Sequence, residues 1–364
     1  MMYPEDQMEN RLNVVKIASM YIAVIMGAGF CSGRESWQFF GVFGRKGYLG
    51  AALAGLGFVV FALMFTYIAI RKKTDDLGML ISPWNNKYIV SVIGWTMAII
   101  YYTIIIAMSA AGGSLIRQQF GIDKRLGGVF IVILVLFTVM GNYERMAGIF
   151  GKVTPVLLAV SFLTVFLVIA SGNISQSGPV SGFKPGAMSP NWFISSIVFM
   201  AYNTLGMVTS SGSCALRAKS RRSAYAGAFA GAFILAVLML LQLVALNKDM
   251  AFTDGLDLPL LAYAGLMYRP LGILYAVILY GSIYATASST FYGFASWLPD
   301  GSYKPAFQII SAFIGYLIGL NGFQFVVEYL YPPQGYIGIL FLTLVVINFI
   351  KLFCEKQVKK TADL

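Results

Sequence analysis

The feature that most constrains this chain is a glycine-rich stretch inside an apolar segment of membrane length. The segment covers residues 14–43, longer than the roughly 20 residues that a helix needs to cross a bilayer, and residues 27–33 read Gly-Ala-Gly-Phe-Cys-Ser-Gly. Glycine weakens a helix by about 1 kcal/mol relative to alanine, and a broken helix in hydrocarbon is tolerated where it lines a cavity. We therefore expect a helix break that forms half of a solute site. The alternative is close helix packing through Gly29 and Gly33.

Composition places the chain in a membrane. Of its 364 residues, 58% are hydrophobic and 11% are charged, whereas soluble domains carry about 25% charged residues. The apolar stretches are long and uninterrupted, which predicts α-helices rather than a barrel. Histidine is absent, and no HExxH or Gly-x-Ser-x-Gly motif occurs, so the sequence argues against an enzyme.

Charge and cysteine usage indicate which partners and which thiol state to expect. The net charge is +11, but the basic residues cluster at the ends of apolar segments, which fits contact with a lipid bilayer and gives no support to nucleic-acid binding. Cys31, Cys214 and Cys354 fall in or beside predicted spans, so we expect free thiols. The first apolar segment is too long for a signal peptide and is expected to stay as the first span.

We expect a polytopic, all-α membrane protein with ten transmembrane helices. The apolar piece at residues 323–330 is under half a span, and Pro332 and Pro333 then stop it, which predicts an interfacial turn or a short helix. With the first residue inside, the inner segments hold 17 of the 26 Lys and Arg residues, so both termini are expected in the cytoplasm, with the chain in the cell (inner) membrane. The expected spans are residues 13–43, 47–70, 88–115, 126–141, 146–171, 192–216, 224–246, 271–298, 305–320 and 336–353.

The sixth expected span repeats the anomaly of the first, because residues 201–206 read Ala-Tyr-Asn-Thr-Leu-Gly. Each half of the chain has five expected spans, an odd number, so the second half enters the membrane from the opposite face. The sequence thus predicts a 5+5 inverted repeat with broken helices 1 and 6, and such paired breaks point to a transport site at the midplane. The predicted divisions are a cytoplasmic tail at 1–12, a first repeat at 13–172, an outer loop at 173–190, a second repeat at 191–353 and a cytoplasmic tail at 354–364.

The chemistry of the two breaks suits a zwitterion such as an amino acid. Bare amides at a half-helix N-terminus attract a carboxylate, and we assign this role to residues 27–30. Unwound carbonyls at 201–204 would hold an amine, and a tyrosine in the third span would add a hydroxyl unless it serves ordinary packing. The predicted substrate-binding residues are Gly27, Ala28, Gly29, Phe30, Tyr102, Ala201, Tyr202, Asn203 and Thr204.

Two further polar groups lie within apolar segments. Arg34 and Glu35 follow the glycine-rich stretch toward the outer face, where they form an outer gate or sit at the interface with extended side chains. The eighth span carries four hydroxyls between residues 286 and 290. These bond back to their own helix or, packed against the first break, supply oxygens to a monovalent ion.

The glycine-rich stretch, continued through Glu35, Gln38-Phe39-Phe40 and Phe43-Gly44-x-x-Gly47, resembles the start of the YkvI-type membrane proteins. That group is related to the amino acid–polyamine–organocation transporters, which share the LeuT-type fold. The resemblance extends to residues 201–203, the hydroxyl-rich eighth span and residues 331–338, so it covers nearly the whole chain. Arg34 departs from the Gln expected there. The resemblance implies a fold and a transporter class, but no substrate.

The wider fold implies an ion site between the first and eighth spans. In proton-coupled relatives a Lys of the fifth span takes the place of the ion. Lys152 matches that position, and its alternative role is a positive-inside anchor. The implied sodium ligands are the carbonyls of Ala23, Met26 and Ala285 and the hydroxyls of Ser288 and Ser289.

These observations predict a secondary active transporter of a small amino acid or related organic solute. Coupling to Na⁺ or H⁺ would drive it by alternating access, and one charge crossing 100 mV supplies about 2.3 kcal/mol. No ATP-binding Gly-x-x-x-x-Gly-Lys-[Ser/Thr] motif is present, so no cofactor beyond the coupling ion is expected. The alternative is a channel or a non-transporting solute sensor on the same fold.

Overall fold

The computed structural model describes residues 11–141, 143–171 and 183–362, and side chains are described except at 143–152 and 356–362. In this part of the chain seven helices are long and apolar enough to cross a membrane. They are α5 (Arg45–Lys72), α7 (Lys87–Phe120), α9 (Tyr143–Ala170), α10 (Trp192–Arg217), α11 (Arg221–Leu246), α14 (Arg269–Ala295) and the run of α16 (Phe323–Tyr329) with α17 (Tyr331–Ala362).

The remaining helices are shorter. Each expected span coincides with helical residues, but α8 and α15 have 17 and 16 residues and the first span is divided, so the ten-helix count stays a prediction. The shorter helices are α2 (Val14–Ile25), α3 (Ala28–Ser32), α4 (Arg34–Phe39), the 3-10 turn η1 (Gly41–Phe43), α6 (Leu77–Ile81), α8 (Lys124–Met140), α12 (Met250–Asp254), α13 (Pro259–Met267) and α15 (Lys304–Gly319).

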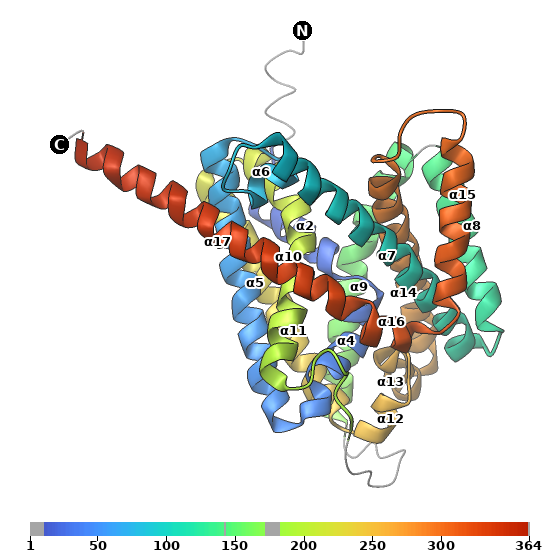
Figure 1. The fold of residues 1–364 in the computed structure, drawn as a ribbon. Helices are drawn as coiled ribbons and strands as arrows, with labels where there is room; N and C mark the ends of the chain where they lie inside the picture. Colours follow the sequence, from blue (N-terminus) through green and yellow to red (C-terminus); the bar gives the residue numbers. More distant parts are fainter. Residues whose placement is uncertain (1–10, 142, 172–182, 363–364) are drawn as a thin grey trace.

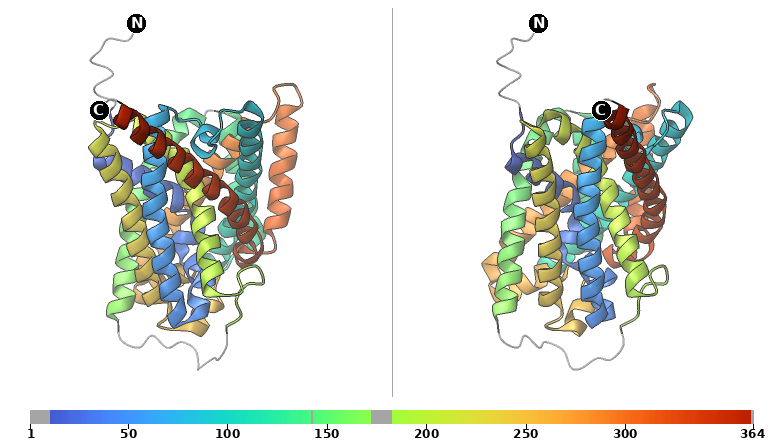
Figure 2. Two further views of the ribbon diagram at one scale, coloured as in Figure 1. Left: turned by 60° about the vertical axis from the view of Figure 1, so that its left-hand side comes forward. Right: turned by 90° about the vertical axis from the view of Figure 1, so that its left-hand side faces the viewer.

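The helices form a bundle with two distinct ends. The start of α2, the end of α17 and the short helix α6 lie at one end, which we call the termini end, while α12 and α13 lie at the other, the α12–α13 end (Figure 1). Helix α17 runs obliquely across the outside of the bundle (Figure 2). The described ends of the chain therefore share one side, as the even number of expected spans requires.

Polar caps begin several of these helices. Asn13 accepts a hydrogen bond from the Lys16 amide at 2.8 Å at the start of α2, and Asn191 accepts from the Phe193 and Ile194 amides at the start of α10. Such caps satisfy amides that have no partner within the helix. They fix the residues at which these helices begin.

The predicted break in the first span is confirmed. Helix α2 ends at Ile25, Gly27 is extended with φ −77° and ψ −176°, and the chain resumes as α3. A second irregularity follows at Gly33, whose φ of 78° lies in the left-handed region that glycine adopts without strain. The first span therefore consists of three short helical pieces.

The predicted break in the sixth span is wrong, because α10 is continuous from Trp192 to Arg217. The polar side chains that suggested a break bond back to their own helix. Asn203 Nδ2 donates to the Phe199 carbonyl at 3.2 Å, and Thr204 Oγ1 donates to the Met200 carbonyl at 2.7 Å. Such i−4 bonds leave the helical ladder in place. Gly206 serves packing, since a Cβ there would lie 2.8 Å from Val24 Cγ1.

The last span begins earlier than expected. Pro332 and Pro333 lie in the first turn of α17, which begins at Tyr331, and the predicted short helix before them is α16. Proline is tolerated in a first helical turn because its missing N–H has no partner there anyway. The two prolines thus start the final helix rather than ending the preceding apolar piece by themselves.

Candidate functional site

An open cavity adjoins the break in the first span. Its volume is about 440 Å³, and it is lined by residues of α2, α7, α9, α10 and α14. The α2 residues that line it, Ala23 and Val24, precede the break, so the cavity lies on the termini side. Thr209 and Ser289 line it and are exposed, which shows that the cavity is not sealed.

Hydroxyl groups give this cavity its polar character. The hydroxyl side chains come from four different helices, α7, α9, α10 and α14, while the intervening lining is apolar. Pockets for small molecules combine such an apolar wall with a few placed polar groups. The hydroxyl-bearing lining residues are Tyr101, Thr154, Thr209, Ser282, Thr286, Ser289 and Thr290.

Three of the five implied sodium ligands line the cavity, namely Ala23, Ala285 and Ser289. The Ser289 hydroxyl donates to the Thr286 carbonyl at 3.1 Å, so its oxygen keeps lone pairs for another partner. Helices α2 and α14, which belong to the first and eighth expected spans, thus line the same cavity.

The other two implied ligands lie behind the cavity wall. The Met26 carbonyl accepts a hydrogen bond from Ser282 Oγ at 3.3 Å. Ser288 is fully buried, and its Oγ has no hydrogen-bond partner among the described residues. A buried hydroxyl without a partner costs free energy, so Ser288 fits a position that a further ligand completes.

Lys152, the predicted coupling residue, lies outside the residues whose side chains are described. Its backbone belongs to α9. Val153 and Thr154, which follow it directly, line the cavity. The part of α9 next to Lys152 therefore borders the cavity, and the coupling role of Lys152 stays a prediction.

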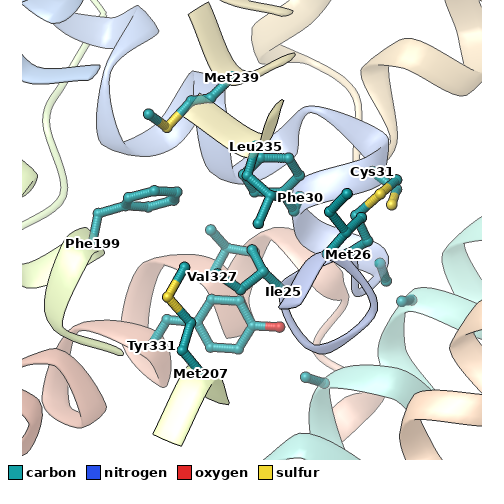
Figure 3. Close-up of a cluster of buried hydrophobic side chains, with 14 of the residues drawn as sticks. Ile25, Met26, Phe30, Cys31, Phe199, Met207, Leu235, Met239, Val327 and Tyr331 are labelled. Carbon is teal, nitrogen blue, oxygen red and sulfur yellow. The ribbon is translucent and has the colours of Figure 1, made fainter. Parts of the chain in front are cut away.

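The amides at the break differ in their hydrogen bonding. The Gly27 amide donates to the Ile25 carbonyl at 2.7 Å, but the amides of Ala28, Gly29 and Phe30 form the first turn of α3 and have no hydrogen-bond partner in the described part of the chain. A Cβ at Gly27 would meet nothing within 4 Å. Figure 3 shows Ile25, Met26, Phe30 and Cys31 around this turn.

Glu35 folds back over the break instead of pointing outward. A Cβ on Gly29 would overlap Glu35 Oε1, and the other carboxyl oxygen, Oε2, accepts a hydrogen bond from the Tyr202 hydroxyl of α10. The Glu35 side chain is 5% exposed. Glu35, one of the two predicted gate residues, therefore lies beside Gly29 and Tyr202, two of the predicted substrate-binding residues.

Arg34 points the other way and is fully buried. Its guanidinium donates to the Asp254 carbonyl at 2.9 Å, to the Leu256 carbonyl at 3.2 Å and to Gln38 Oε1 at 2.8 Å. The Trp37 indole adds a bond to Asp254 Oδ1 at 2.8 Å. Helix α4 is thereby tied to the connection between α12 and α13.

The same connection, residues 254–258, also holds α7 and α16. Asp257 Oδ2 accepts from the Ser114 hydroxyl at 2.7 Å, and Asp257 Oδ1 accepts from the Gln324 amide at 2.9 Å. Gln118 Nε2 donates to the Leu258 carbonyl at 2.8 Å. We call residues 254–258 the latch, because they join three helices across the α12–α13 end.

The remaining substrate-binding candidates do not form the predicted second half-site. The carbonyls of residues 201–204 lie within the continuous helix α10, and Thr204 Oγ1 bonds to the Ala201 carbonyl at 3.0 Å. The Tyr102 hydroxyl donates to the Ser311 carbonyl at 3.0 Å, so Tyr102 is directed at α15. Its neighbour Tyr101 lines the cavity instead.

Two residues near the break were not among the predicted site residues. Tyr331, at the start of α17, places its ring 5.1 Å from that of Tyr202, and Figure 3 shows it facing Ile25. Gln242 of α11 donates to the Phe30 carbonyl at 2.9 Å and accepts from Ser36. A lone Gln in an apolar helix is a signal of this kind of role, because a buried amide needs partners.

Two curated proteins of Bacillus subtilis (strain 168) are similar to the chain along most of its length. The uncharacterized membrane protein YkvI is 23% identical over 338 residues, which are 90% of this chain and 93% of that protein. The uncharacterized protein YyaD is 24% identical over 343 residues, or 89% of this chain and 93% of that protein. No family model matches the chain. The chain is a distant homologue of YkvI, as the resemblance predicted.

Solved structures establish the fold. The inward-facing conformation of Mhp1 matches 96% of this chain and 79% of Mhp1 at a TM-score of 0.60 with 15% identity. A manganese transporter of Eremococcus coleocola matches 96% of this chain and 80% of that protein at a TM-score of 0.50 with 13% identity. The chain therefore has the LeuT-type transporter fold.

A pair of glycine substitutions tests the geometry at the break. In Gly29→Ala the new methyl group displaces the Glu35 carboxyl from Tyr202, and we expect a loss of about 1–3 kcal/mol in stability, typical of overpacking. Gly27→Ala has open space and is expected to cost under about 1 kcal/mol. Thermal unfolding of both variants in detergent provides the measurement. Equal losses in the two variants would contradict the placement of Glu35.

Proposed function

We propose that the chain is a secondary active transporter that moves a small amino acid or related organic solute by alternating access. The observation that carries this proposal is the pairing of an open cavity beside the broken first span with a latch that holds the opposite end together. The similarity to YkvI and the LeuT-type fold agree with it but do not identify a solute.

Alternating access requires a site that opens to one side at a time. In this structure the cavity lies on the termini side, and Arg34 and Asp257 close the α12–α13 end through hydrogen bonds to separate helices. Hydrogen bonds to charged groups contribute about 1.5–3 kcal/mol each, so a conformational change that forms other bonds can offset their loss. A channel would need a path open at both ends together.

The cavity favours a small polar solute. Its volume of about 440 Å³ falls in the range of small-molecule sites, and the amides of Ala28, Gly29 and Phe30 would bind a carboxylate. Mhp1 is described as a nucleobase-cation-symport-1 family transporter and another match as a manganese transporter. The described residues contain no group of three His, Cys, Asp or Glu side chains suited to a metal ion, so an organic solute is favoured over a divalent metal.

The membrane arrangement completes the proposal. Ten spans, related as two inverted repeats at residues 13–172 and 191–353, would place the termini end in the cytoplasm, as the bias of Lys and Arg indicates. The cavity would then open inward, and the latch would close the outer face.

Cation coupling is part of the proposal. Sodium would be held by Ala23, Ala285 and Ser289 at the cavity, with Ser288 and Met26 turning toward it as α2 moves. Lys152 is the alternative coupling group for protons. The unpartnered Ser288 hydroxyl supports the sodium version of the site, because a cation site needs oxygens that are otherwise unused.

Counterflow distinguishes a carrier from its rivals. The purified protein in liposomes, preloaded with an unlabelled amino acid, is expected to accelerate uptake of the same labelled amino acid in a screen of amino acids with and without Na⁺. A carrier exchanges solute because its binding site can return to the other face of the membrane with solute bound. A channel would show flux without this acceleration, and a sensor would bind solute without flux; either result would overturn the proposal.

A matched pair of serine variants tests the sodium site. Ser289→Ala removes an oxygen that lines the cavity, and we expect binding of radioactive sodium to the purified protein to fall about tenfold or more, as loss of a ligand does. Ser296→Ala, at the C-cap of α14, is the control, because its hydroxyl also bonds to this helix, at the Gly293 carbonyl. Sodium binding that is unchanged in Ser289→Ala would remove this residue from the site.

A further inference from the structure

We propose that Glu35 binds the coupling proton, and that release of this proton opens the α12–α13 end of the molecule. The inference rests on the proposed function, since it names the coupling ion of that transporter. To the candidate coupling sites at Lys152 and the implied sodium ligands it adds a carboxyl group that lies at the helix break.

Glu35 occupies the junction between the broken first span and the unbroken α10. Its Oε2 accepts from the Tyr202 hydroxyl, and its Oε1 lies against Gly29. Glu35 is 5% exposed, and the ring of Tyr202, its hydrogen-bond donor, packs on those of Phe39 and Tyr331. A movement of the first span relative to α10 at this level therefore changes the Glu35–Tyr202 hydrogen bond.

No cation balances this carboxyl group among the described side chains. The titratable groups that face it are Tyr202 of α10, Tyr331 of α17 and Cys31 of α3, none of which is positively charged. Asn203 also lies near the carboxyl group. An ionised carboxylate in such a place carries a large uncompensated desolvation cost.

The neighbouring charges are directed elsewhere. Arg34 adjoins Glu35 in the chain, but its guanidinium is used by Asp254, Leu256 and Gln38 on the latch side. The negative charge of Glu328, in α16, interacts electrostatically with Arg34. From α11, the neutral side chain of Gln242 contacts α4 and accepts a hydrogen bond from Ser36.

A proton is the cation that this contact can hold. Gly29 lies directly against Oε1 and the Tyr202 hydroxyl donates to Oε2, so both carboxyl oxygens already have close neighbours. A proton adds almost no volume there, unlike an ammonium group or a hydrated metal ion. Proton binding converts the carboxylate to a carboxylic acid by forming one O–H bond at Oε1, and the charge of the site rises by one. The neutral acid then fits the apolar contact without a counter-ion.

The link to opening lies within α4. Arg34 and Trp37, on the same short helix as Glu35, make the bonds to Asp254 of the latch. A movement of α4 that brings an ionised Glu35 to water therefore draws Arg34 and Trp37 away from Asp254. Acid conditions stabilise the latched structure seen here, and alkaline conditions favour its opening.

Cysteine labelling reports this opening without any solute. Val327 of α16 is fully buried beside the break, and we place Val327→Cys in a protein whose three native cysteines are replaced by alanine. The labelling rate with a maleimide, divided by the rate in the same protein carrying Glu35→Gln, cancels the pH dependence of the thiol. We expect this ratio to rise with pH by up to about tenfold per pH unit, the limit for one titrating group.

Matched variants complete the test. Glu355→Gln, at an exposed position of α17, should leave the pH profile of labelling unchanged, and Glu35→Asp should retain a pH dependence because it keeps a carboxyl group. Infrared difference spectra between acid and alkaline buffer should show a carboxyl band that Glu35→Gln lacks. A flat labelling ratio, or a carboxyl band that survives in Glu35→Gln, overturns the inference.

The outcomes separate this inference from the proposed function. Counterflow with a flat labelling ratio would retain the transporter and reject Glu35 as its proton site. A pH-dependent ratio without counterflow of any amino acid would support the proton site and reject the proposed solute class. Labelling that responds to an added amine at fixed pH, and not to pH itself, overturns the proton in favour of a cationic solute.

Discussion

The structure depends on a gap in the hydrogen-bond ladder of its first span. Helix α2 ends at Ile25, and the amides of Ala28, Gly29 and Phe30 begin a new helix without partners in the described chain. In hydrocarbon each unsatisfied group costs several kcal/mol, so the surroundings of the gap must compensate for it. The Gln242 side chain donates to the Phe30 carbonyl at this gap, the Glu35 carboxyl lies against Gly29, and the open cavity begins one turn earlier at Ala23 and Val24.

The two sides of the gap behave differently. On the termini side the cavity walls are hydroxyl-bearing and partly exposed, whereas on the other side the latch residues Asp254 and Asp257 bind three helices. Arg34 and Glu35 are adjacent in the chain, but Arg34 is bonded to the latch, whereas Glu35 folds back over the break and accepts from Tyr202. A single short helix thus connects the chemistry at the break to the closure of the opposite end, which is what alternating access requires of a moving part.

Hydrophobic segments, caps and glycines made the helices and the first break predictable. The second predicted break fails at Asn203 and Thr204, because polar side chains in a helix satisfy themselves at their own i−4 carbonyls as readily as they mark an unwound turn. Periodicity gave no means of separating Tyr101 from Tyr102, of turning Glu35 inward, or of pairing Asp257 with Ser114. Those contacts join residues between 143 and 209 positions apart and arise only from the packing of the bundle.

Amide hydrogen exchange tests the central claim, that one span is broken and its counterpart is intact. Exchange reports local opening of hydrogen-bonded amides, and mass spectrometry of the protein in detergent resolves both segments. We expect deuterium to enter residues 28–30 rapidly, while residues 201–204 of α10 stay protected under the same conditions. Equal protection of the two segments, or faster exchange at 201–204, would contradict the account.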